Sequence, residues 1–160
     1  DGSIDRFKAR LVVGGHRQRE FIDYGEVYAP VSKYASLRAF LGTAAAGDWE
    51  VQGLDISNAF LNGKLNIPAY MRQPEGCAVG GDHLVCQLHK TLYGLKQAPR
   101  AWYMKLNEEL KSIGFIPSIA DPGLFTLVNK TSTIYILIYV DDILIAGKDK
   151  DAVEQMKEKP

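Results

Sequence analysis

The longest apolar stretch of the chain lies near its C-terminal end and contains two adjacent carboxylates. Residues 134–146 read Ile-Tyr-Ile-Leu-Ile-Tyr-Val-Asp-Asp-Ile-Leu-Ile-Ala, a composition that favours strands. The pattern predicts one strand or two short strands folded back on each other, with Asp141 and Asp142 suited to a turn. Neighbouring carboxylates repel each other and need a positive partner when buried. Two interpretations stay open on this stretch alone: an ordinary hairpin turn, and a hairpin that presents carboxylates to divalent cations.

Five further stretches have the residue pattern of strands. Short apolar or alternating runs that are bounded by Gly, Pro, Asn or Asp are typical of strands. Such runs occupy residues 7–13, 49–56, 69–72, 84–88 and 124–128. In the first of these, Lys8 and Arg10 alternate with apolar residues, so a strand there would point both cations the same way.

The sequence predicts three helices, the first two from the helical spacing of their apolar residues. They cover residues 36–47, 99–113 and 150–159. Ser32 or Ser36 is expected to cap the first helix and Gly47 to end it. Pro99 fits the first turn of the second helix, and Gly114 stops it. Because strands and helices follow no regular βαβ repeat, the order favours an α+β sheet with helices packed on one face.

Composition excludes several classes of protein. The chain has 160 residues, 46% of them hydrophobic and 24% charged, which suits a single globular domain. The longest apolar run, residues 134–140, is too short to span a bilayer, and the first residues lack the apolar region of a secretory signal. Two cysteines form no disulfide framework, and Cys77, His83, Cys86 and His89 match no familiar zinc spacing. We therefore expect a protein with reduced thiols that is neither secreted nor membrane-spanning.

Charge decides little by itself. Nineteen Lys and Arg residues balance nineteen Asp and Glu residues, so binding to a nucleic acid must depend on where the charges lie. Basic residues gather in residues 8–19 and 89–111, and either cluster is also compatible with a solvated face. The chain begins without Met and ends at Pro160, so we expect it to be part of a longer protein.

A third carboxylate suggests a metal site. Asp55 ends the predicted strand 49–56, while Asp141 and Asp142 lie at the tip of another. If these strands are neighbours, three carboxylates converge at one edge of a sheet. Two metal ions held there could clamp the attacking and leaving oxygens of a phosphoryl displacement. Lys8 and Arg10 could then hold a triphosphate.

Four segments together resemble one known family. Residues 51–63, Val-Gln-Gly-Leu-Asp-Ile-Ser-Asn-Ala-Phe-Leu-Asn-Gly, resemble the first catalytic motif of Ty1/copia-type retrotransposon reverse transcriptases. Residues 92–102, Leu-Tyr-Gly-Leu-Lys-Gln-Ala-Pro-Arg-Ala-Trp, resemble the central signature of that family. Residues 139–142, Tyr-Val-Asp-Asp, are similar to the metal-binding motif of reverse transcriptases, and residues 8–15 resemble the fingers strand. Four motifs in the family's order are far more specific than any one of them.

The resemblance implies a role for each matching residue. Asp55, Asp141 and Asp142 would be the catalytic acids and, with Ile56, would hold two Mg²⁺ ions, or Mn²⁺ in their place. Roles toward the incoming nucleotide fall to Lys8, Arg10, Ser57, Asn58, Ala59, Phe60 and Gln97, and contacts with template and primer fall to Arg100 and Tyr139. In this scheme the Phe60 ring leaves no room for a 2′-hydroxyl, so that deoxynucleotides are selected.

Structural alternatives remain for several of these residues. Phe60 also suits a core aromatic, Gln97 a polar group at a helix start, and Lys8 and Arg10 a solvated strand. The metal-binding roles of Asp55, Asp141 and Asp142 are likewise what the resemblance implies.

The family also implies an architecture and a setting. The fold would be a partial fingers–palm with an antiparallel palm sheet; residues 1–48 would be fingers-like, residues 49–160 mostly palm, and the thumb and RNase H absent. Expected partners are an RNA or DNA template-primer, dNTPs and the remaining Pol polyprotein with RNase H and integrase, in cytoplasmic particles. The implied function is RNA-directed DNA polymerase. Two alternatives remain: a decayed or domesticated module that only binds nucleic acid, and another metal-dependent phosphotransferase or nuclease, which the signature in residues 92–102 disfavours.

Overall fold

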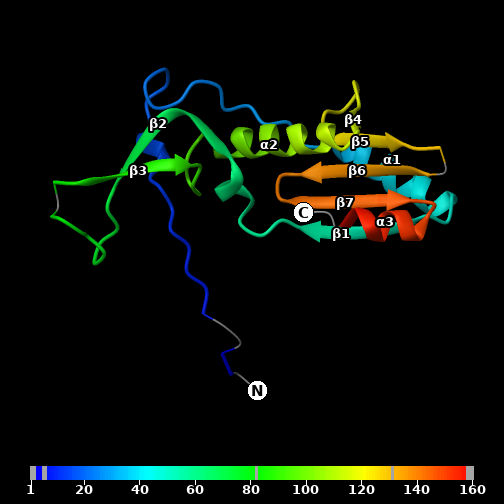
Figure 1. Cartoon of the computed structure of the whole chain (residues 1–160), viewed down its shortest axis with the longest axis horizontal. Coiled ribbons are helices and arrows are strands. Elements are labelled where there is room, and N and C mark those ends of the chain that lie inside the picture. Colours follow the sequence, from blue (N-terminus) through cyan, green and yellow to red (C-terminus); the bar gives the residue numbers. More distant parts are fainter. Residues whose placement is uncertain (1–2, 5–6, 82, 131, 158–160) are drawn as a thin grey trace.

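Two sheets lie towards opposite ends of an elongated molecule, and the helix α2 (Ala98–Ser112) runs from between them along the larger sheet (Figure 1). The structure is a computed structural model that describes residues 3–4, 7–81, 83–130 and 132–157. Within these residues, no helix combines the length and the apolar composition that a bilayer span requires.

The larger sheet has five antiparallel strands in the order β1-β7-β6-β5-β4. Its strands are β1 (Glu50–Asp55), β4 (Ile116–Pro117), β5 (Leu124–Val128), β6 (Thr133–Tyr139) and β7 (Asp142–Gly147). The predicted strands 49–56 and 124–128 and the predicted hairpin in residues 134–146 are therefore confirmed. Strand β4 was not predicted, because two residues are too few to form a pattern. The mixture of helices and antiparallel strands confirms the α+β class.

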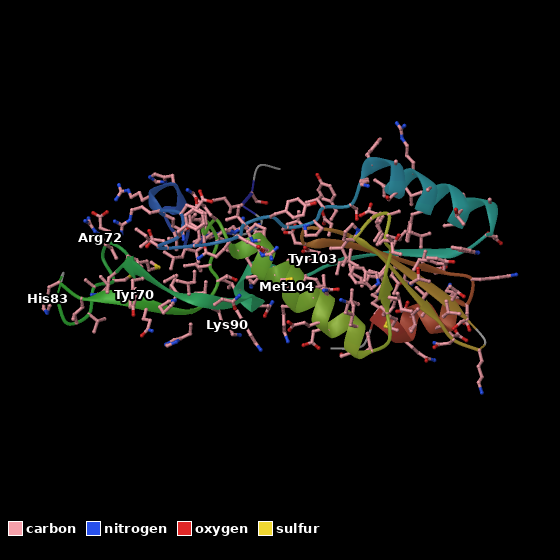
Figure 2. All side chains as sticks on the ribbon, turned by 90° about the horizontal axis from the view of Figure 1, so that it is seen from above. Tyr70, Arg72, His83, Lys90, Tyr103 and Met104 are labelled. Atoms are coloured by element: carbon pink, nitrogen blue, oxygen red, sulfur yellow. The ribbon has the colours of Figure 1, made fainter. Side chains whose placement is uncertain are left out.

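Helices cover both faces of this sheet, which corrects the expectation that they pack on one face. Helices α2 and α3 (Lys150–Lys157) join one cluster with Ile136 and Ile145. Helix α1 (Tyr34–Ala46) packs through Phe40 on the opposite face, against Leu137 and Ala146. Figure 2 shows α1 on one side of the sheet and α2 and α3 on the other. Strands β6 and β7 explain this arrangement, because successive residues of a strand point to opposite faces and their sequence is almost continuously apolar. Both faces of the sheet are therefore apolar and must be buried.

The smaller sheet pairs β2 (Lys64–Arg72) with β3 (Val85–Lys90). The predicted strands 69–72 and 84–88 are confirmed, and β2 begins earlier than expected, with an irregular register between Lys64 and Ala69. A short 3-10 helix, η2 (Ala59–Asn62), connects β1 to β2. Another 3-10 helix, η1 (Gly15–Arg17), lies in the N-terminal segment.

The strand predicted for residues 7–13 is wrong, because this segment is irregular. Among the backbone bonds of the described residues, only the Val13 N–H, which donates to the Tyr93 carbonyl at 2.8 Å, ties it to another part of the chain. Alternating residues describe a face that a strand could have, but a strand also needs a neighbour to pair with. Lys8 and Arg10 therefore do not share a strand face.

The helix ends are partly as expected. Neither Ser32 nor Ser36 caps α1, whose N-cap is Lys33 without a side-chain cap bond. The Ser32 hydroxyl instead donates to the Ile138 carbonyl at 2.5 Å, so tertiary contact has displaced the local cap. Gly47 ends α1 as predicted. Gly114, with φ of +98°, follows α2 in the left-handed conformation that glycine favours. The last residues of the third predicted helix, 158–159, lie outside the described residues.

Candidate active site

Strand register brings the three predicted acids to one edge of the five-stranded sheet. Asp55, the last residue of β1, is the direct cross-strand partner of Asp142, the first residue of β7. Asp142 also pairs with Tyr139 at the end of β6, which leaves Val140 and Asp141 as the turn between the two strands. The Ile56 N–H donates to the Asp141 carbonyl at 3.3 Å, so that the chain leaving β1 is joined to the turn.

The turn has an unusual backbone. Val140 has a φ of +62°, whereas Asp141 is not among the residues with positive φ. A positive φ at the first of two turn residues defines a type II′ turn, a place that usually holds glycine. A β-branched residue there is strained and must be held by its surroundings.

Trp102 supplies part of that hold. The side chain is 6% exposed, and its indole Nε1–H donates to the Val140 carbonyl at 2.9 Å. This bond ties the turn to α2. The motif in residues 92–102 ends at Trp102 but does not reveal this contact. The available signal was that a buried indole N–H needs an acceptor.

The carboxylates form an open set rather than a closed cage. No group of three or more His, Cys, Asp or Glu side chains within the described residues is arranged to hold a metal ion. The side-chain hydrogen bonds and ion pairs of the same residues leave Asp55, Asp141 and Asp142 without partners. Like charges directly across a strand pair are destabilising. An oxygen-rich edge without a counter-charge fits Mg²⁺, which is commonly held by one or two carboxylates and completed by water and substrate phosphates.

An apolar hollow borders the acids on the α1 face of the sheet. It has a volume of about 720 Å³ and is lined by Asp55, Asp142, Tyr139 and aliphatic side chains that include Leu37 and Leu137. Its size is in the range of small-molecule sites. The acids therefore lie at the rim of a concave surface.

A second group of predicted residues meets around Tyr93. The Phe60 ring packs edge-on against the Tyr93 ring, with centroids 5.3 Å apart and an interplanar angle of 73°. The Arg10 guanidinium carbon lies 4.3 Å from the centroid of the same Tyr93 ring. Arg10 and Phe60, which are far apart in sequence, therefore share one aromatic neighbour. Tyr93 lies in the motif of residues 92–102, which assigns it no role of its own.

Two glycines permit the close crossing that brings Arg10 to Tyr93. Gly94 has a φ of +92°, and a Cβ there would lie 2.1 Å from the Val13 carbonyl oxygen. A Cβ on Gly15 would lie 1.8 Å from the Gly94 carbonyl oxygen. No Cβ fits at either position, and Gly94 also has a positive φ that glycine favours, so this crossing fixes the path of the N-terminal segment.

The segment after β1 supplies the other predicted nucleotide residues. Ser57 and Asn58 are exposed, and Asn58 adopts the left-handed conformation before η2. Ala59 is buried. The Thr91 hydroxyl donates to the Phe60 carbonyl. This bond ties η2 to the residue that follows β3.

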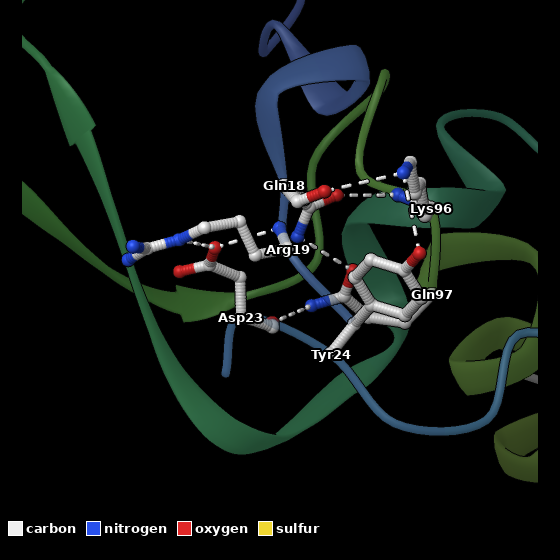
Figure 3. Close-up of polar contacts among 6 residues, drawn as sticks. All are labelled: Gln18, Arg19, Asp23, Tyr24, Lys96 and Gln97. Atoms are coloured by element: carbon white, nitrogen blue, oxygen red, sulfur yellow. Dashed lines mark hydrogen bonds and ion pairs between the residues drawn. The ribbon is translucent and has the colours of Figure 1, made fainter. Parts of the chain in front are cut away.

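Gln97 is engaged by the N-terminal loop (Figure 3). Its Oε1 accepts from Gln18 Nε2 at 2.9 Å, and its Nε2 donates to the Asp23 carbonyl at 3.2 Å. The neighbouring Lys96 bonds the Gln18 carbonyl and the Tyr24 hydroxyl, each at 3.2 Å. These bonds join the start of α2 to the loop. Within the described residues, the side-chain hydrogen bonds of Gln97 go to this loop and not to the cluster of Arg10, Tyr93 and Phe60.

The remaining predicted residues are dispersed. Arg100 pairs with Glu26 and donates to the Tyr28 carbonyl at 2.9 Å. Tyr139 is 58% exposed beside Asp142. Lys8 is exposed on the irregular N-terminal segment.

Asp121 is a buried carboxylate that lies outside the predicted site. Asp121 accepts from the Lys33 N–H at 2.8 Å and from the Gly123 N–H at 2.9 Å, and also bonds Ser36. Burial alone would raise the pKa of Asp121, but the bonds from Ser36, Lys33 and Gly123 together lower it below the usual value. The ionised carboxylate thus joins the start of α1 to the turn before β5.

Comparisons with known proteins agree with the sequence motifs. The family model described as reverse transcriptase (RNA-dependent DNA polymerase) matches residues 2–159. The retrovirus-related Pol polyprotein from transposon RE1 of Arabidopsis thaliana is 50% identical over 151 residues, 93% of this chain. The one from transposon TNT 1-94 of Nicotiana tabacum is 47% identical over 159 residues, 98% of this chain. The chain spans only 10% and 12% of these two proteins. No solved structure matches the chain.

Proposed function

The chain belongs to the reverse transcriptase (RNA-dependent DNA polymerase) family, with copia-type Pol polyproteins as relatives, and from this premise we propose that it carries the catalytic centre of an RNA-directed DNA polymerase. The observation that carries the proposal is the register of β1 and β7, which makes Asp55 and Asp142 direct neighbours beside the turn residue Asp141. Because the chain spans a small part of its relatives, the activity of the whole protein is part of the proposal.

We assign metal binding to the open carboxylate edge. Asp55 and Asp141 are the main ligands, Asp142 is more peripheral, and Ile56 lies beside them through its bond to the turn. Two divalent cations bound there, Mg²⁺ or Mn²⁺, would assist deprotonation of the primer 3′-hydroxyl and neutralise the leaving pyrophosphate. The 3′-oxygen forms a bond to the α-phosphorus of the dNTP, and the bond from that phosphorus to pyrophosphate breaks.

The remaining assignments concern the nucleotide. Arg10 and Lys8 bind the triphosphate as cations, and the backbone N–H groups of Ser57 and Asn58 face its oxygens. The nucleotide contact expected of Ala59 stays a prediction, because its N–H already donates to the Ile56 carbonyl at 3.2 Å. Phe60 lies under the sugar and excludes a 2′-hydroxyl. The nucleotide contact expected of Gln97 stays a prediction, and its bonds to Gln18 and Asp23 favour a role in holding the loop.

Contacts with nucleic acid are assigned to residues near the sheet edge. The exposed Tyr139 beside Asp142 suits a contact with the primer, and Arg100 is assigned to the template side although Glu26 pairs with it. Binding is expected to weaken as salt rises, because phosphate contacts dominate. Further partners are the RNase H and integrase parts of Pol, in cytoplasmic particles.

The fingers–palm division is also a proposal. The five-stranded sheet with its helices corresponds to a palm, and the two-stranded sheet with the N-terminal segment corresponds to fingers. The boundary expected between residues 48 and 49 stays a prediction. The packing of α1 on the larger sheet favours a palm that includes α1.

The test is Mg²⁺-dependent incorporation of dNTPs on an RNA template by a longer Pol protein that contains this chain. Asp141→Asn is expected to lose at least about a hundredfold in rate, because it removes a ligand charge at the reacting centre. Asp151→Asn, an exposed acid on α3, is the matched control and is expected to keep full activity. The chain by itself is expected to extend a primer very poorly.

Equal activity of the wild type and Asp141→Asn would contradict the metal assignment. A wild-type protein that binds template-primer but incorporates nothing would favour the alternative of a decayed or domesticated binding module.

A further inference from the structure

We infer that Tyr93 is a positioning residue that holds the Phe60 ring and the Arg10 guanidinium in the nucleotide pocket, and so controls discrimination between deoxyribose and ribose. The inference rests on the proposed function and deepens it. Tyr93 lies in the central signature, residues 92–102, but its place there does not assign it a role.

The ring contacts fix the orientation of both neighbours. Phe60 meets Tyr93 edge-on, at 5.3 Å and 73°, which is a favoured arrangement of aromatic pairs. Arg10 lies over the Tyr93 ring at 4.3 Å, in a cation–π arrangement. Because both contacts are directional, one aromatic side chain sets the position of a sugar-contacting ring and of a phosphate-binding cation together.

The chemistry of Arg10 is suited to an anionic ligand. Among the described residues, no carboxylate forms an ion pair with its guanidinium. A guanidinium stacked on an aromatic ring keeps the N–H groups at its edges free for hydrogen bonds. Tyr93 therefore holds the cation without neutralising it, which is what a triphosphate site requires.

The backbone around Tyr93 is fixed from two sides. Its carbonyl accepts from the Val13 N–H at 2.8 Å, and the following Gly94 forms the tight crossing with the N-terminal segment. Phe60 is anchored separately, because the buried Thr91 hydroxyl donates to its carbonyl. Both backbones thus stay in place when the Tyr93 ring is removed, and the loss falls on the two side chains that pack against it.

The experiment compares kcat/KM for dATP and ATP in the longer Pol protein. Tyr93→Leu removes the aromatic ring and is expected to lower the preference for dATP about tenfold, the scale of a lost apolar contact in a specificity pocket. It is also expected to raise KM for dATP more than it lowers kcat, because Arg10 loses its support. Tyr93→Phe keeps the ring and is expected to restore both values.

Two controls separate this inference from the proposed function. Phe60→Val removes the selecting ring directly and is expected to lower sugar discrimination at least as much as Tyr93→Leu. Tyr70→Leu changes a tyrosine that is 60% exposed on β2, as labelled in Figure 2, and is expected to change neither value. A wild type without Mg²⁺-dependent incorporation would refute the proposed function.

A second measurement decides the positioning role even in that case. Urea unfolding of Tyr93→Leu, Phe60→Val and the double variant gives their coupling, which is expected to be clearly non-additive because the rings touch. Additive stabilities, or wild-type discrimination in Tyr93→Leu alongside loss in Phe60→Val, would overturn the inference. So would a Tyr93→Phe variant that behaves like Tyr93→Leu, since the hydroxyl rather than the ring would then be responsible.

Discussion

Replacing Trp102 with phenylalanine should loosen the turn that carries Asp141. The variant keeps an aromatic ring in α2 but removes the indole N–H that donates to the Val140 carbonyl at 2.9 Å. A carbonyl that loses its donor costs about 1–2 kcal/mol when it is partly shielded from water. The smaller ring at a site only 6% exposed adds about 1 kcal/mol for lost packing. We therefore expect the free energy of unfolding to fall by about 2–3 kcal/mol.

Two measurements test this prediction. Urea unfolding of the chain, monitored by circular dichroism, gives its stability, and nucleotide incorporation by the longer Pol protein gives its activity. Trp49→Phe is the matched control, because Trp49 stacks on Tyr135 at 5.2 Å, away from the turn. The control is expected to lose some stability but to retain incorporation, whereas Trp102→Phe loses both. If the two variants behaved alike in both measurements, the role given to the indole bond would be wrong.

Three further changes test other parts of the account. The pKa of Asp121 is lowered in the folded protein, so its ionised form stabilises the fold above the usual pKa of 3.8, and this stability is lost as pH falls through the lower folded pKa. Asp121→Asn should therefore flatten the dependence of the free energy of unfolding on acid pH, measured in urea. A pH dependence equal to that of Asp151→Asn would contradict this. Gly94→Ala should lower the free energy of unfolding by more than about 2 kcal/mol and raise KM for dNTP, since its Cβ has no room. Gly42→Ala, at a position in α1 with open space around the added Cβ, should be neutral or stabilising in the same assays. Val140→Gly should be tolerated or slightly stabilising in thermal unfolding, because glycine accepts the φ of +62°; a loss above about 2 kcal/mol would refute the strained turn.

The strongest periodic patterns predicted the fold well. The apolar run of residues 134–146 became β6 and β7, and the stripe that includes Trp102 and Leu110 became α2. Asp55 was expected near Asp141 and Asp142 only if the strands that carry them were neighbours. The structure pairs β1 with β7, which meets this condition. Local sequence identifies the elements because burial on one face repeats at the period of the element.

The errors share a physical cause, which is that pairing and packing are decided by distant residues. Residues 7–13 alternate like a strand but have no strand beside them. Ser32 could cap α1, yet its hydroxyl bonds the Ile138 carbonyl across the fold. The expectation that helices cover only one face of the sheet could have been avoided from the sequence of β6. Its isoleucines face one side and Leu137 faces the other, so both faces are apolar.

The sequence motifs named candidate residues for the site but not the contacts between them. A family motif marks Phe60 and Arg10 as residues, but it does not say that Tyr93 joins them, because that contact depends on the glycine crossing. Gln97 is a second example, since its position in the signature gave no indication of its bonds to Gln18 and Asp23.

Paramagnetic broadening by Mn²⁺ locates a bound divalent cation without requiring turnover, and it can therefore show whether the β1–β7 edge is a cation site. In ¹H–¹⁵N spectra of the chain titrated with Mn²⁺ and dATP, the amide signals of Ile56, Asp141 and Asp142 are expected to broaden first. Asp141→Asn is expected to abolish this order, and Asp151→Asn is expected to leave it intact. Broadening that begins at the acids of α3, or that is unchanged in Asp141→Asn, would contradict a cation site at the β1–β7 edge.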